Sequence, residues 1–457
     1  MTPTLSHSAD PTDHPPRPGD LPRTIGFFGG AAIMIGVTIG SGIFRTPTSI
    51  AGELGSPALI LLLWAVGGVL SLCGALAYAE LAAMFPHSGG VYVFLREGFG
   101  RVVAFVFGWT YLLITKPAAA AGIAIVFAEH LNPLLGVNWN PRVTTTVVLV
   151  ALTLVNTFRL KLGAGVAIVL TALKMLALTM IVVLGVALMK GDAANLAAIP
   201  APKSLLLALA PVMAAILWTY DGWSDIGSIA GEIKNPQRRL PLIYFAGTGA
   251  VIVLYLAVNA VYMWMVPLEE MRTTGTIAPL VMHRLFGPAG GVLVNVLILI
   301  STIGATHAAI ITGARVTFAQ ARDGLLFRFL GHVHPNFATP AVALWAQLAL
   351  SVTAIWVLQT FERMAGTFVF TMWIFYGLAA MALFALRRTR PDLPRPYRCW
   401  GYPLVPALFI AAAAVMTALS IWQDPRGTLP WIGLLVVGVP AYYLWQHVTR
   451  AAPVGDR

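Results

Sequence analysis

Two apolar stretches of the sequence are interrupted where polar chemistry becomes possible. The stretch MIGVTIGSGIF carries Gly36, Gly40 and Gly42, and the stretch ILWTYDGWSDIG carries Asp221 beside Gly222. Glycine inside a helix costs about 1 kcal/mol relative to alanine, so these residues predict breaks in two helices. A broken helix exposes free N–H groups from one half and free C=O groups from the other. Together these groups hold an anion and a cation side by side, as a zwitterionic α-amino acid requires.

Three charged residues lie within apolar stretches: Lys116, Lys174 and Asp221. A carboxylate at bilayer depth costs at least a few kcal/mol unless it is paired or faces a cavity. A buried ammonium is paired, hydrogen-bonded to carbonyls or deprotonated. The Asp221 side chain therefore pairs with a cationic substrate, pairs with Lys116 or Lys174, or accepts from the freed amides of its own segment. Close helix packing is the alternative for glycines alone, but a matched break that carries Asp221 favours a binding site.

The composition of the whole chain predicts that these residues lie in membrane-spanning segments. Of 457 residues, 58% are hydrophobic and only 10% are charged, whereas globular proteins have about 25% charged residues. A spanning helix takes roughly 20 apolar residues. The composition therefore predicts an all-α polytopic protein in a lipid bilayer and excludes soluble, fibrous and disulfide-stapled proteins. In such a chain the net charge of +11 indicates basic cytoplasmic loops rather than nucleic-acid binding.

Apolar stretches bounded by charges, proline or glycine predict twelve spans. These are residues 24–51, 57–84, 101–131, 142–158, 163–189, 204–231, 240–265, 290–320, 340–360, 362–386, 402–421 and 429–448. Spans 1 and 6 carry the breaks, and each begins a group of five helices. Because five is odd, we predict two inverted repeats, at 22–189 and 204–386, followed by helices 11 and 12 at 402–448. Interrupted helices at corresponding positions of two halves indicate a transporter site at the bilayer midplane.

The distribution of basic residues predicts that both termini are cytoplasmic. With the N-terminus inside, 19 Lys and Arg residues fall on the cytoplasmic side and 8 on the opposite side, leaving Lys116 and Lys174 within spans. This asymmetry follows the positive-inside rule. Residues 1–21 contain no apolar core of a signal peptide and are predicted to form a disordered cytoplasmic tail. Residues 449–457 are predicted to form a second cytoplasmic tail, in a multi-pass protein of the cell (inner) membrane.

The motifs IGSGIF, CGALAYAELAAMFPHSGGVYVFL and WTYDGWSDIGSIAGEIKNPQRRLP resemble the amino acid–polyamine–organocation superfamily, especially its L-amino-acid-transporter group. The resemblance covers about residues 22–448. It implies the leucine-transporter-like fold, with an amino acid substrate bound between helices 1 and 6. It also implies sodium-independent secondary active transport by alternating access, expected here as exchange of small or neutral L-amino acids. The alternative is a proton-coupled transporter of amines, polyamines or cationic amino acids, because Asp221 offers a site for a second ammonium.

The resemblance assigns substrate-binding roles to the first break. The backbone amides of Ser41, Gly42 and Ile43 are expected to receive the substrate carboxylate at the start of a half-helix. Free donors and the helix dipole both favour an anion there. The carbonyl of Ile39 is expected to accept from the substrate ammonium.

The same resemblance extends to helices 6 and 7. The carbonyls of Trp218, Thr219 and Asp221 match the stretch that binds the ammonium in the family. The ring of Trp218 is expected to cover the substrate on its outer side, with ordinary packing as the alternative. Tyr255 either places its hydroxyl near the substrate carboxylate or makes an ordinary interhelical hydrogen bond.

Lys174 in span 5 resembles a lysine of sodium-independent members of the superfamily. It would place a positive charge where sodium binds in sodium-coupled relatives, with Ser301 and Thr302 as its expected oxygen partners. We therefore predict no sodium dependence. Lys116, followed by Pro117, matches a basic-proline element, for which a structural or gating role is favoured over substrate contact.

The segment PHSGGVYVF between spans 2 and 3 matches the cytoplasmic motif of the superfamily, and its glycines and proline predict a turn. Two acidic residues near this face, Glu80 and Glu232, have two interpretations. Either they pair with arginines such as Arg96, Arg238 or Arg239 as an inner gate, or they belong to a solvated surface.

The sequence offers no enzyme signature. It contains no HExxH motif, no GxSxG motif in a span and no convincing group of metal ligands, so no catalytic residue, metal or cofactor is expected. A channel and a non-transporting sensor remain as alternatives, distinguished by flux. Residues 132–141 contain no cysteine, whereas a disulfide to an accessory subunit in this family needs one there. We therefore expect no covalent accessory subunit.

Overall fold

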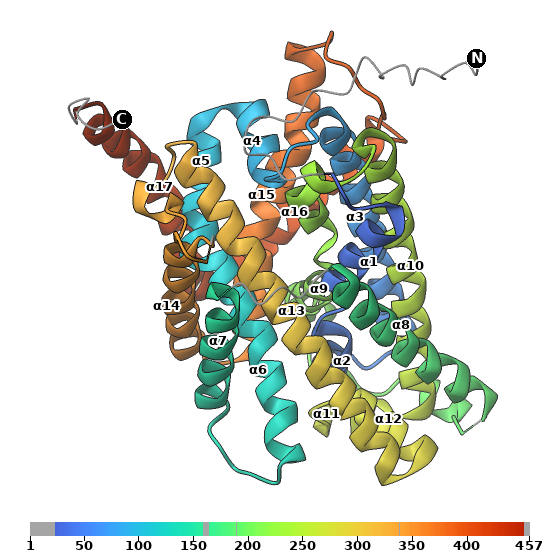
Figure 1. Cartoon of the computed structure of the whole chain (residues 1–457). Helices are drawn as coiled ribbons and strands as arrows, with labels where there is room; N and C mark the ends of the chain where they lie inside the picture. The colour runs from blue at the N-terminus through green and yellow to red at the C-terminus, as the bar shows by residue number, and fades with distance from the viewer. Residues whose placement is uncertain (1–22, 159–163, 189, 338, 452–457) are drawn as a thin grey trace, which may run out of the picture.

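The computed structural model describes residues 23–158, 164–188, 190–337 and 339–451, and helices make up most of this part of the chain (Figure 1). Eleven helical segments in it are long and apolar enough to cross a membrane. A further helix, α7 (Pro141–Thr157), has 17 residues, the lower limit for a span. The prediction of an all-α protein with twelve spans is confirmed.

The helices follow the predicted spans closely. The first five spans comprise α1 (Phe27–Thr38) with α2 (Gly42–Ala51), α3 (Pro57–Met84), then α5 (Arg101–Thr110) with the π-helical turn η1 (Tyr111–Thr115) and α6 (Lys116–Leu134), then α7, and α8 (Ala164–Ala187). The next five comprise α9 (Leu205–Tyr220) with the 3₁₀ helix η3 (Trp223–Glu232), α10 (Pro236–Met265), α13 (Pro288–Arg322), α14 (Ala341–Leu358) and α15 (Phe361–Thr389). The last two are α16 (Leu404–Gln423) and α17 (Pro425–Ala451).

Proline marks the start of several spans. Pro57, Pro141, Pro236, Pro288 and Pro425 are each the first residue of a helix. At this position the fixed φ of proline suits the helix and its missing N–H loses no intrahelical bond. These prolines explain why the starts of spans could be placed within a few residues from sequence.

Short helices outside the spans differ from the prediction. The segment 86–94 is not a turn throughout, because Val91 begins helix α4 (Val91–Phe99). Its turn is confined to the residues before α4, where Gly89 and Gly90 have φ of 136° and 51°. Helices α11 (Leu268–Thr273) and α12 (Ile277–Phe286) and the 3₁₀ turns η2 (Ala193–Leu196) and η4 (Arg328–Gly331) also connect spans. They were not predicted because they are too short for a span.

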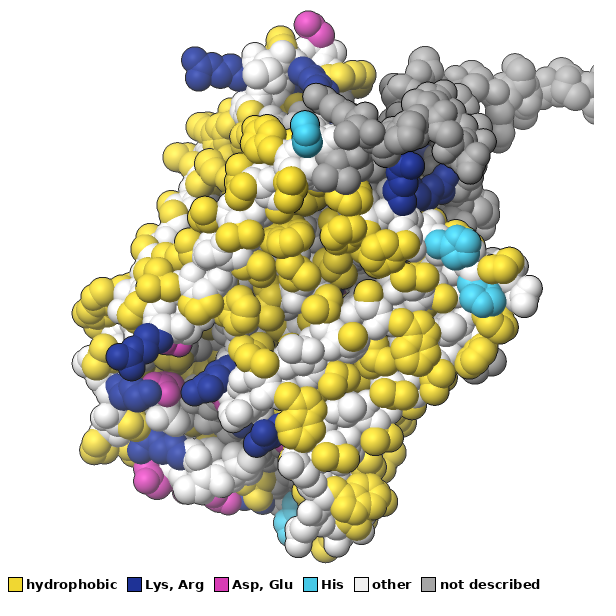
Figure 2. Space-filling view, turned by 90° about the vertical axis from the view of Figure 1, so that its left-hand side faces the viewer, with side chains coloured by type: hydrophobic (Ala, Val, Ile, Leu, Met, Phe, Trp, Pro, Cys, Tyr) yellow, Lys and Arg dark blue, Asp and Glu magenta, His cyan; other side chains and the backbone are white. Residues whose placement is uncertain are grey.

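The predicted tails lie mostly outside the described residues. Residues 1–22 and 452–457 are not described, and α17 extends to Ala451, so the last span continues past the predicted boundary at 449. On the face in Figure 2, hydrophobic side chains cover the middle and charged side chains gather toward its two ends. Outward-facing apolar side chains such as Val253, with 70% of its surface exposed, suit contact with lipid.

The two interrupted spans run in opposite directions and are joined at one end. The N–H of Ile25 donates to the carbonyl of Glu232 at 3.0 Å, and the N–H of Lys234 donates to the carbonyl of Ile25 at 2.8 Å. This bridge places the start of α1 beside the end of η3. The breaks of both spans then meet in the middle of the molecule.

Candidate functional site

The first break lies between Thr38 and Gly42, as predicted. α1 ends at Thr38 and α2 begins at Gly42. The first amides of α2 have no acceptor within the helix, and the positive end of its dipole lies there. The hydroxyl of Ser41 is buried and has no hydrogen-bond partner among the described residues. The break therefore presents unsatisfied donors suited to an anion.

The second break lies at Asp221 and Gly222. α9 ends at Tyr220, Asp221 is extended with φ −67° and ψ 155°, and Gly222 has φ 119°. The last carbonyls of α9 have no donor within the helix. The chain continues as the 3₁₀ helix η3 from Trp223, so this break presents acceptors suited to a cation.

Glycine allows the backbones of the two breaks to touch. A Cβ on Gly42 would lie 2.8 Å from Cα of Thr219, and a Cβ on Gly222 would lie 2.8 Å from both N and Cα of Thr38. No side chain fits at either position without moving backbone. The hydroxyls of Thr46 and Thr219 are 2.9 Å apart beside this contact. Close packing and broken helices are thus two consequences of the same glycines.

A cavity lies at this junction of the two breaks. Its volume is about 50 Å³. On the same measure one water molecule needs roughly 10–15 Å³, so the cavity suits a small ligand. Its walls come from spans 1, 3, 6, 8 and 10. The lining residues are Val37, Thr38, Gly40, Ser41, Gly42, Lys116, Ala119, Ile123, Trp218, Asp221, Gly222, Asp225, Ala305, Ala309 and Phe368.

Comparison with known proteins assigns the chain to a family. A family model described as "Amino acid permease" matches residues 25–439. The chain belongs to this amino acid permease family. The b(0,+)-type amino acid transporter 1 of Mus musculus is 30% identical, and the match covers 93% of this chain and 88% of the relative. The serine/threonine exchanger SteT of Bacillus subtilis is 30% identical over 93% of this chain and 97% of its own length. The cystine/glutamate transporter of Homo sapiens is 32% identical, and the match covers 93% of this chain and 85% of the relative. These matches confirm the family resemblance of the sequence motifs.

The predicted site residues of the permease fall into three groups. Five of them line the cavity: Ser41, Gly42, Lys116, Trp218 and Asp221. Others are buried behind its wall or contact the first break: Ile39, Ile43, Thr219, Tyr255, Lys174 and Ser301. Thr302 and Glu80 are also buried, but they do not line the cavity and they form hydrogen bonds with Ile298 and Arg387.

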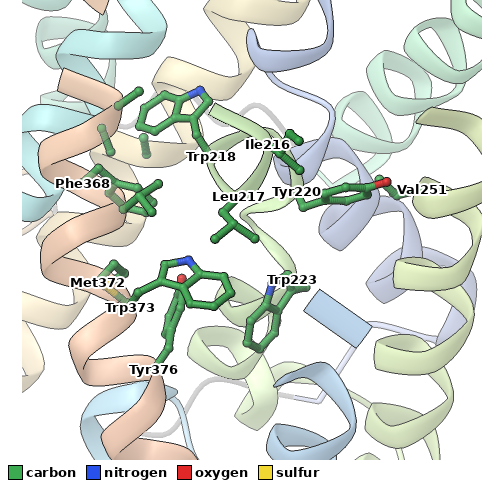
Figure 3. Close-up of a cluster of buried hydrophobic side chains, with 14 of the residues drawn as sticks. Ile216, Leu217, Trp218, Tyr220, Trp223, Val251, Phe368, Met372, Trp373 and Tyr376 are labelled. Carbon is green, nitrogen blue, oxygen red and sulfur yellow. The ribbon is translucent and has the colours of Figure 1, made fainter. Parts of the chain in front are cut away.

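Trp218 forms an aromatic wall with span 10. Its ring packs edge-on against Phe361 and Phe368, with centroid distances of 5.7 and 5.2 Å, and Figure 3 shows Trp218 of α9 facing Phe368 of α15. Both Trp218 and Phe368 line the cavity. The indole therefore limits the volume available to a ligand on this side.

The Asp221 carboxylate is bound to span 10. The hydroxyl of Tyr376 donates to Asp221 Oδ1 at 2.6 Å, and the hydroxyls of Tyr376 and Ser224 are 2.7 Å apart. The ring of Tyr376 also packs against Trp223 at 5.2 Å (Figure 3). Among the alternatives open from sequence, Asp221 pairs with neither Lys116 nor Lys174. Tyr376 carried no signal in the sequence that separated it from other aromatic residues of span 10.

Lys116 pairs with Asp225, a residue the sequence interpretation did not select. The Lys116 ammonium lies 3.4 and 3.3 Å from the two carboxylate oxygens of Asp225. It also lies 5.5 Å from the ring centroid of Tyr111. Asp225 follows Asp221 by four residues in the same broken segment. That second acidic residue at helical spacing was the signal available to find it.

Lys174 binds the first break directly rather than the hydroxyls of span 8. Its ammonium donates to the carbonyls of Gly36 and Ile39, both at 3.0 Å. The prediction of Ser301 and Thr302 as its oxygen partners is wrong. Ser301 donates weakly to the carbonyls of Ile39 and Gly40, each at 3.4 Å. Thr302 donates to the carbonyl of Ile298 in its own helix at 2.8 Å, because a threonine hydroxyl reaches its own i−4 carbonyl without any tertiary contact.

The sequence left two alternatives for Tyr255, and the structure contains the second, an interhelical hydrogen bond. Its hydroxyl donates to the carbonyl of Thr38 at 3.0 Å, the last residue of α1. Its ring packs against Trp64 and Tyr220, with centroids 5.9 and 5.3 Å away. The cavity lining does not include Tyr255, so its hydroxyl stabilises the first break from behind.

Glu80 is fully buried and joins helix α3 to the last turns of α15 and to the segment after it. Arg387 Nε and Nη2 donate to its two carboxylate oxygens at 3.0 and 2.6 Å, and the N–H of Cys399 donates at 2.7 Å. Arg395 lies 3.6 Å away. Burial raises the pKa of the Cys399 thiol to about 12, and the Glu80 carboxylate adds to this shift. The thiol is therefore protonated and unreactive at neutral pH.

The proposed pairing of acidic residues with Arg96, Arg238 or Arg239 is wrong. Glu80 pairs with Arg387 and Arg395 instead, because the end of α15 and the segment after it pack against α3. Glu232 pairs with Arg315 at 3.3 Å. Arg96 pairs with Asp323 at 2.7 Å.

Glu80→Gln tests the contact that Glu80 makes with Arg387 and with the amide of Cys399. We expect amide hydrogen exchange of residues 390–403 to accelerate at least about tenfold, because breaking one partner of a buried ion pair costs several kcal/mol. Mass spectrometry of the purified permease measures the exchange, with the amide of Cys399 as the most direct reporter. Glu97→Gln is the control, since its ion pairs with Arg96 and Arg390 are partly exposed and such pairs contribute little. Unchanged protection in Glu80→Gln would contradict the contact.

Proposed function

We propose that this permease exchanges small neutral L-amino acids by alternating access. The meeting of the two breaks at one cavity carries the proposal, since it offers donors from α2 and acceptors from α9 together. The amides of Ser41, Gly42 and Ile43 bind the substrate carboxylate in this scheme. Two features support a small substrate: the aromatic wall at Trp218 and a cavity of about 50 Å³. The similarity to a protein named serine/threonine exchanger supports exchange.

In this proposal the ammonium of the substrate binds at the end of α9, in span 6. The carbonyl of Ile39 already accepts from both Lys174 and Ser301, so it has little capacity left for a ligand. The carbonyls of Thr219 and Asp221 lie at the open end of α9, where helix geometry leaves acceptors free. The carbonyl of Trp218 lies beside them and accepts one hydrogen bond, from the N–H of Asp221 at 3.2 Å. They are the better partners for an ammonium.

We propose further that transport needs no sodium. The Lys174 ammonium occupies the carbonyl oxygens of Gly36 and Ile39 between spans 1 and 5. A cation such as sodium prefers the same type of oxygen ligand. A fixed positive group there repels a second cation and stabilises the break in its place.

The membrane setting is proposed from topology. We propose that both termini lie in the cytoplasm and that the protein lies in the inner membrane, and the excess of Lys and Arg on one side supports this orientation. The antiparallel course of the two broken spans supports inverted repeats at 22–189 and 204–386, with 402–448 added to them. Both cysteines of the chain, Cys73 and Cys399, are buried, which supports function without a disulfide-linked subunit.

Uptake by proteoliposomes tests the proposal. We expect uptake of labelled serine only when the vesicles contain an unlabelled amino acid, because the substrate site of an exchanger reorients only with an amino acid bound. Replacing sodium by choline should leave the rate unchanged. Competition by alanine, serine, asparagine and putrescine measures selectivity on the same preparation.

Specific outcomes would contradict this function. Uptake into empty vesicles driven by an inward proton gradient would favour symport. Inhibition by putrescine but not by alanine or serine would favour an amine carrier. Binding without flux would indicate a sensor, and currents above carrier rates would indicate a channel.

A further inference from the structure

The Lys116–Asp225 pair lies in the wall of the cavity. Lys116 comes from α6 directly after the π-helical turn η1, and Asp225 comes from the first turn of η3. Both side chains are largely buried, with 7% and 17% of their surfaces exposed, and both line the cavity. The pair thus joins span 3 to η3, the part of span 6 that follows its break, at the ligand site.

Charge at this position acts directly on a bound ligand. Interactions between charges are several-fold stronger beside a buried cavity than in bulk water. An unpaired Lys116 would attract a carboxylate on a substrate side chain. Asp225 lies within 3.4 Å of the ammonium and cancels most of this attraction.

The other charged groups near the cavity do not replace Asp225. Asp221 also lines the cavity, but its Oδ1 accepts from Tyr376. Lys174 binds the carbonyls of Gly36 and Ile39 and is not among the lining residues. With Asp225 present, the formal charge of the three lining groups Lys116, Asp221 and Asp225 is negative.

We infer that Asp225 is a specificity-determining residue that excludes amino acids with acidic side chains by neutralising Lys116. This inference rests on the proposed exchange function and deepens it by naming the accepted side-chain charge. A neutral side chain in the cavity lies beside the Lys116–Asp225 ion pair, in which neither charge is free. An acidic side chain meets Asp225 and Asp221 with no free cation to bind it.

Three amino acids of similar size separate charge from shape. Asparagine and aspartate are nearly isosteric and differ by one negative charge, and 2,4-diaminobutyrate carries a positive charge on a side chain of similar length. Their ability to inhibit serine exchange in proteoliposomes gives a charge preference for each variant. Wild-type protein should prefer asparagine over aspartate.

Single substitutions should shift this preference in opposite directions. Asp225→Asn should raise the affinity for aspartate relative to asparagine at least about tenfold, because one negative charge leaves the wall. Lys116→Met should raise the affinity for 2,4-diaminobutyrate relative to asparagine by a similar factor. The double variant should return the preference to within about threefold of wild type. Asp392→Asn, on the exposed segment after α15, is the matched control and should match wild type.

The outcomes separate this inference from the proposed function. A ratio of aspartate to asparagine that stays within about threefold of wild type in Asp225→Asn would overturn the inference, as would a wild type that prefers aspartate. Equal loss of all three ligands in both single variants would indicate a purely structural pair and would also overturn it. If wild type binds these amino acids in detergent but does not exchange them, the exchange function fails. Binding ratios then test the inference on the same variants.

Discussion

Lys174→Met is expected to reduce amino acid exchange by about 100-fold. The substitution removes two hydrogen bonds from an ammonium to the carbonyls of Gly36 and Ile39. Hydrogen bonds involving a charged group contribute about 1.5–3 kcal/mol each, so their joint loss is about 3 kcal/mol or more. Every 1.4 kcal/mol corresponds to about tenfold. The initial rate of serine exchange in proteoliposomes measures the effect, at matched protein content.

Lys190→Met provides the matched control for this experiment. Lys190 also donates to two backbone carbonyls, those of Arg284 and Leu285 at 3.3 and 2.9 Å, but it is exposed and lies away from the breaks. Its loss should change the rate less than about twofold. If Lys174→Met exchanges serine at the control rate, the ammonium does not maintain the first break for transport. Sodium-stimulated exchange in Lys174→Met would in turn support the view that the lysine replaces a sodium ion.

The sequence predicted those features of the fold that depend on local composition. A run of apolar residues suffices to place a span, and α3 (Pro57–Met84) has the predicted bounds because Ser56 and Pro57 start it. The breaks were also predictable, since Gly42 and Gly222 are unusual residues for the middle of a spanning helix. These signals require no knowledge of neighbouring helices.

Side-chain partners depended on tertiary packing and were mostly missed. Glu80 and Arg387 are 307 residues apart in sequence, and Lys116 and Asp225 are 109 apart. Nothing in the local sequence ranks Arg387 above the other arginines of the segments that the sequence predicts to be cytoplasmic. The need of Lys174 for oxygen partners followed from its burial, but the choice between carbonyls of span 1 and hydroxyls of span 8 depended on how closely α8 packs against α1.

The contact of the two breaks depends on Gly222 most directly. Its φ of 119° is one that L-residues rarely adopt, and its missing side chain leaves room for the backbone of Thr38. Alanine there would bring Cβ to 2.8 Å from N and Cα of Thr38. Because these are backbone atoms of α1, a rotamer change does not relieve the overlap. Either α1 or η3 must move, and the cavity between them changes shape.

Gly222→Ala is therefore expected to reduce exchange by about 100-fold. A left-handed backbone costs a residue with a Cβ roughly 1–2 kcal/mol, and overpacking adds typically 1–3 kcal/mol. Gly249→Ala in α10 is the control, because a Cβ there meets no atom within 4 Å, and it should retain the wild-type rate. Thermal unfolding of both variants in detergent separates a displaced site from a failure to fold. Wild-type exchange by Gly222→Ala would show that the close approach of the two breaks is not needed for transport, and would remove the main structural support for a substrate site between them.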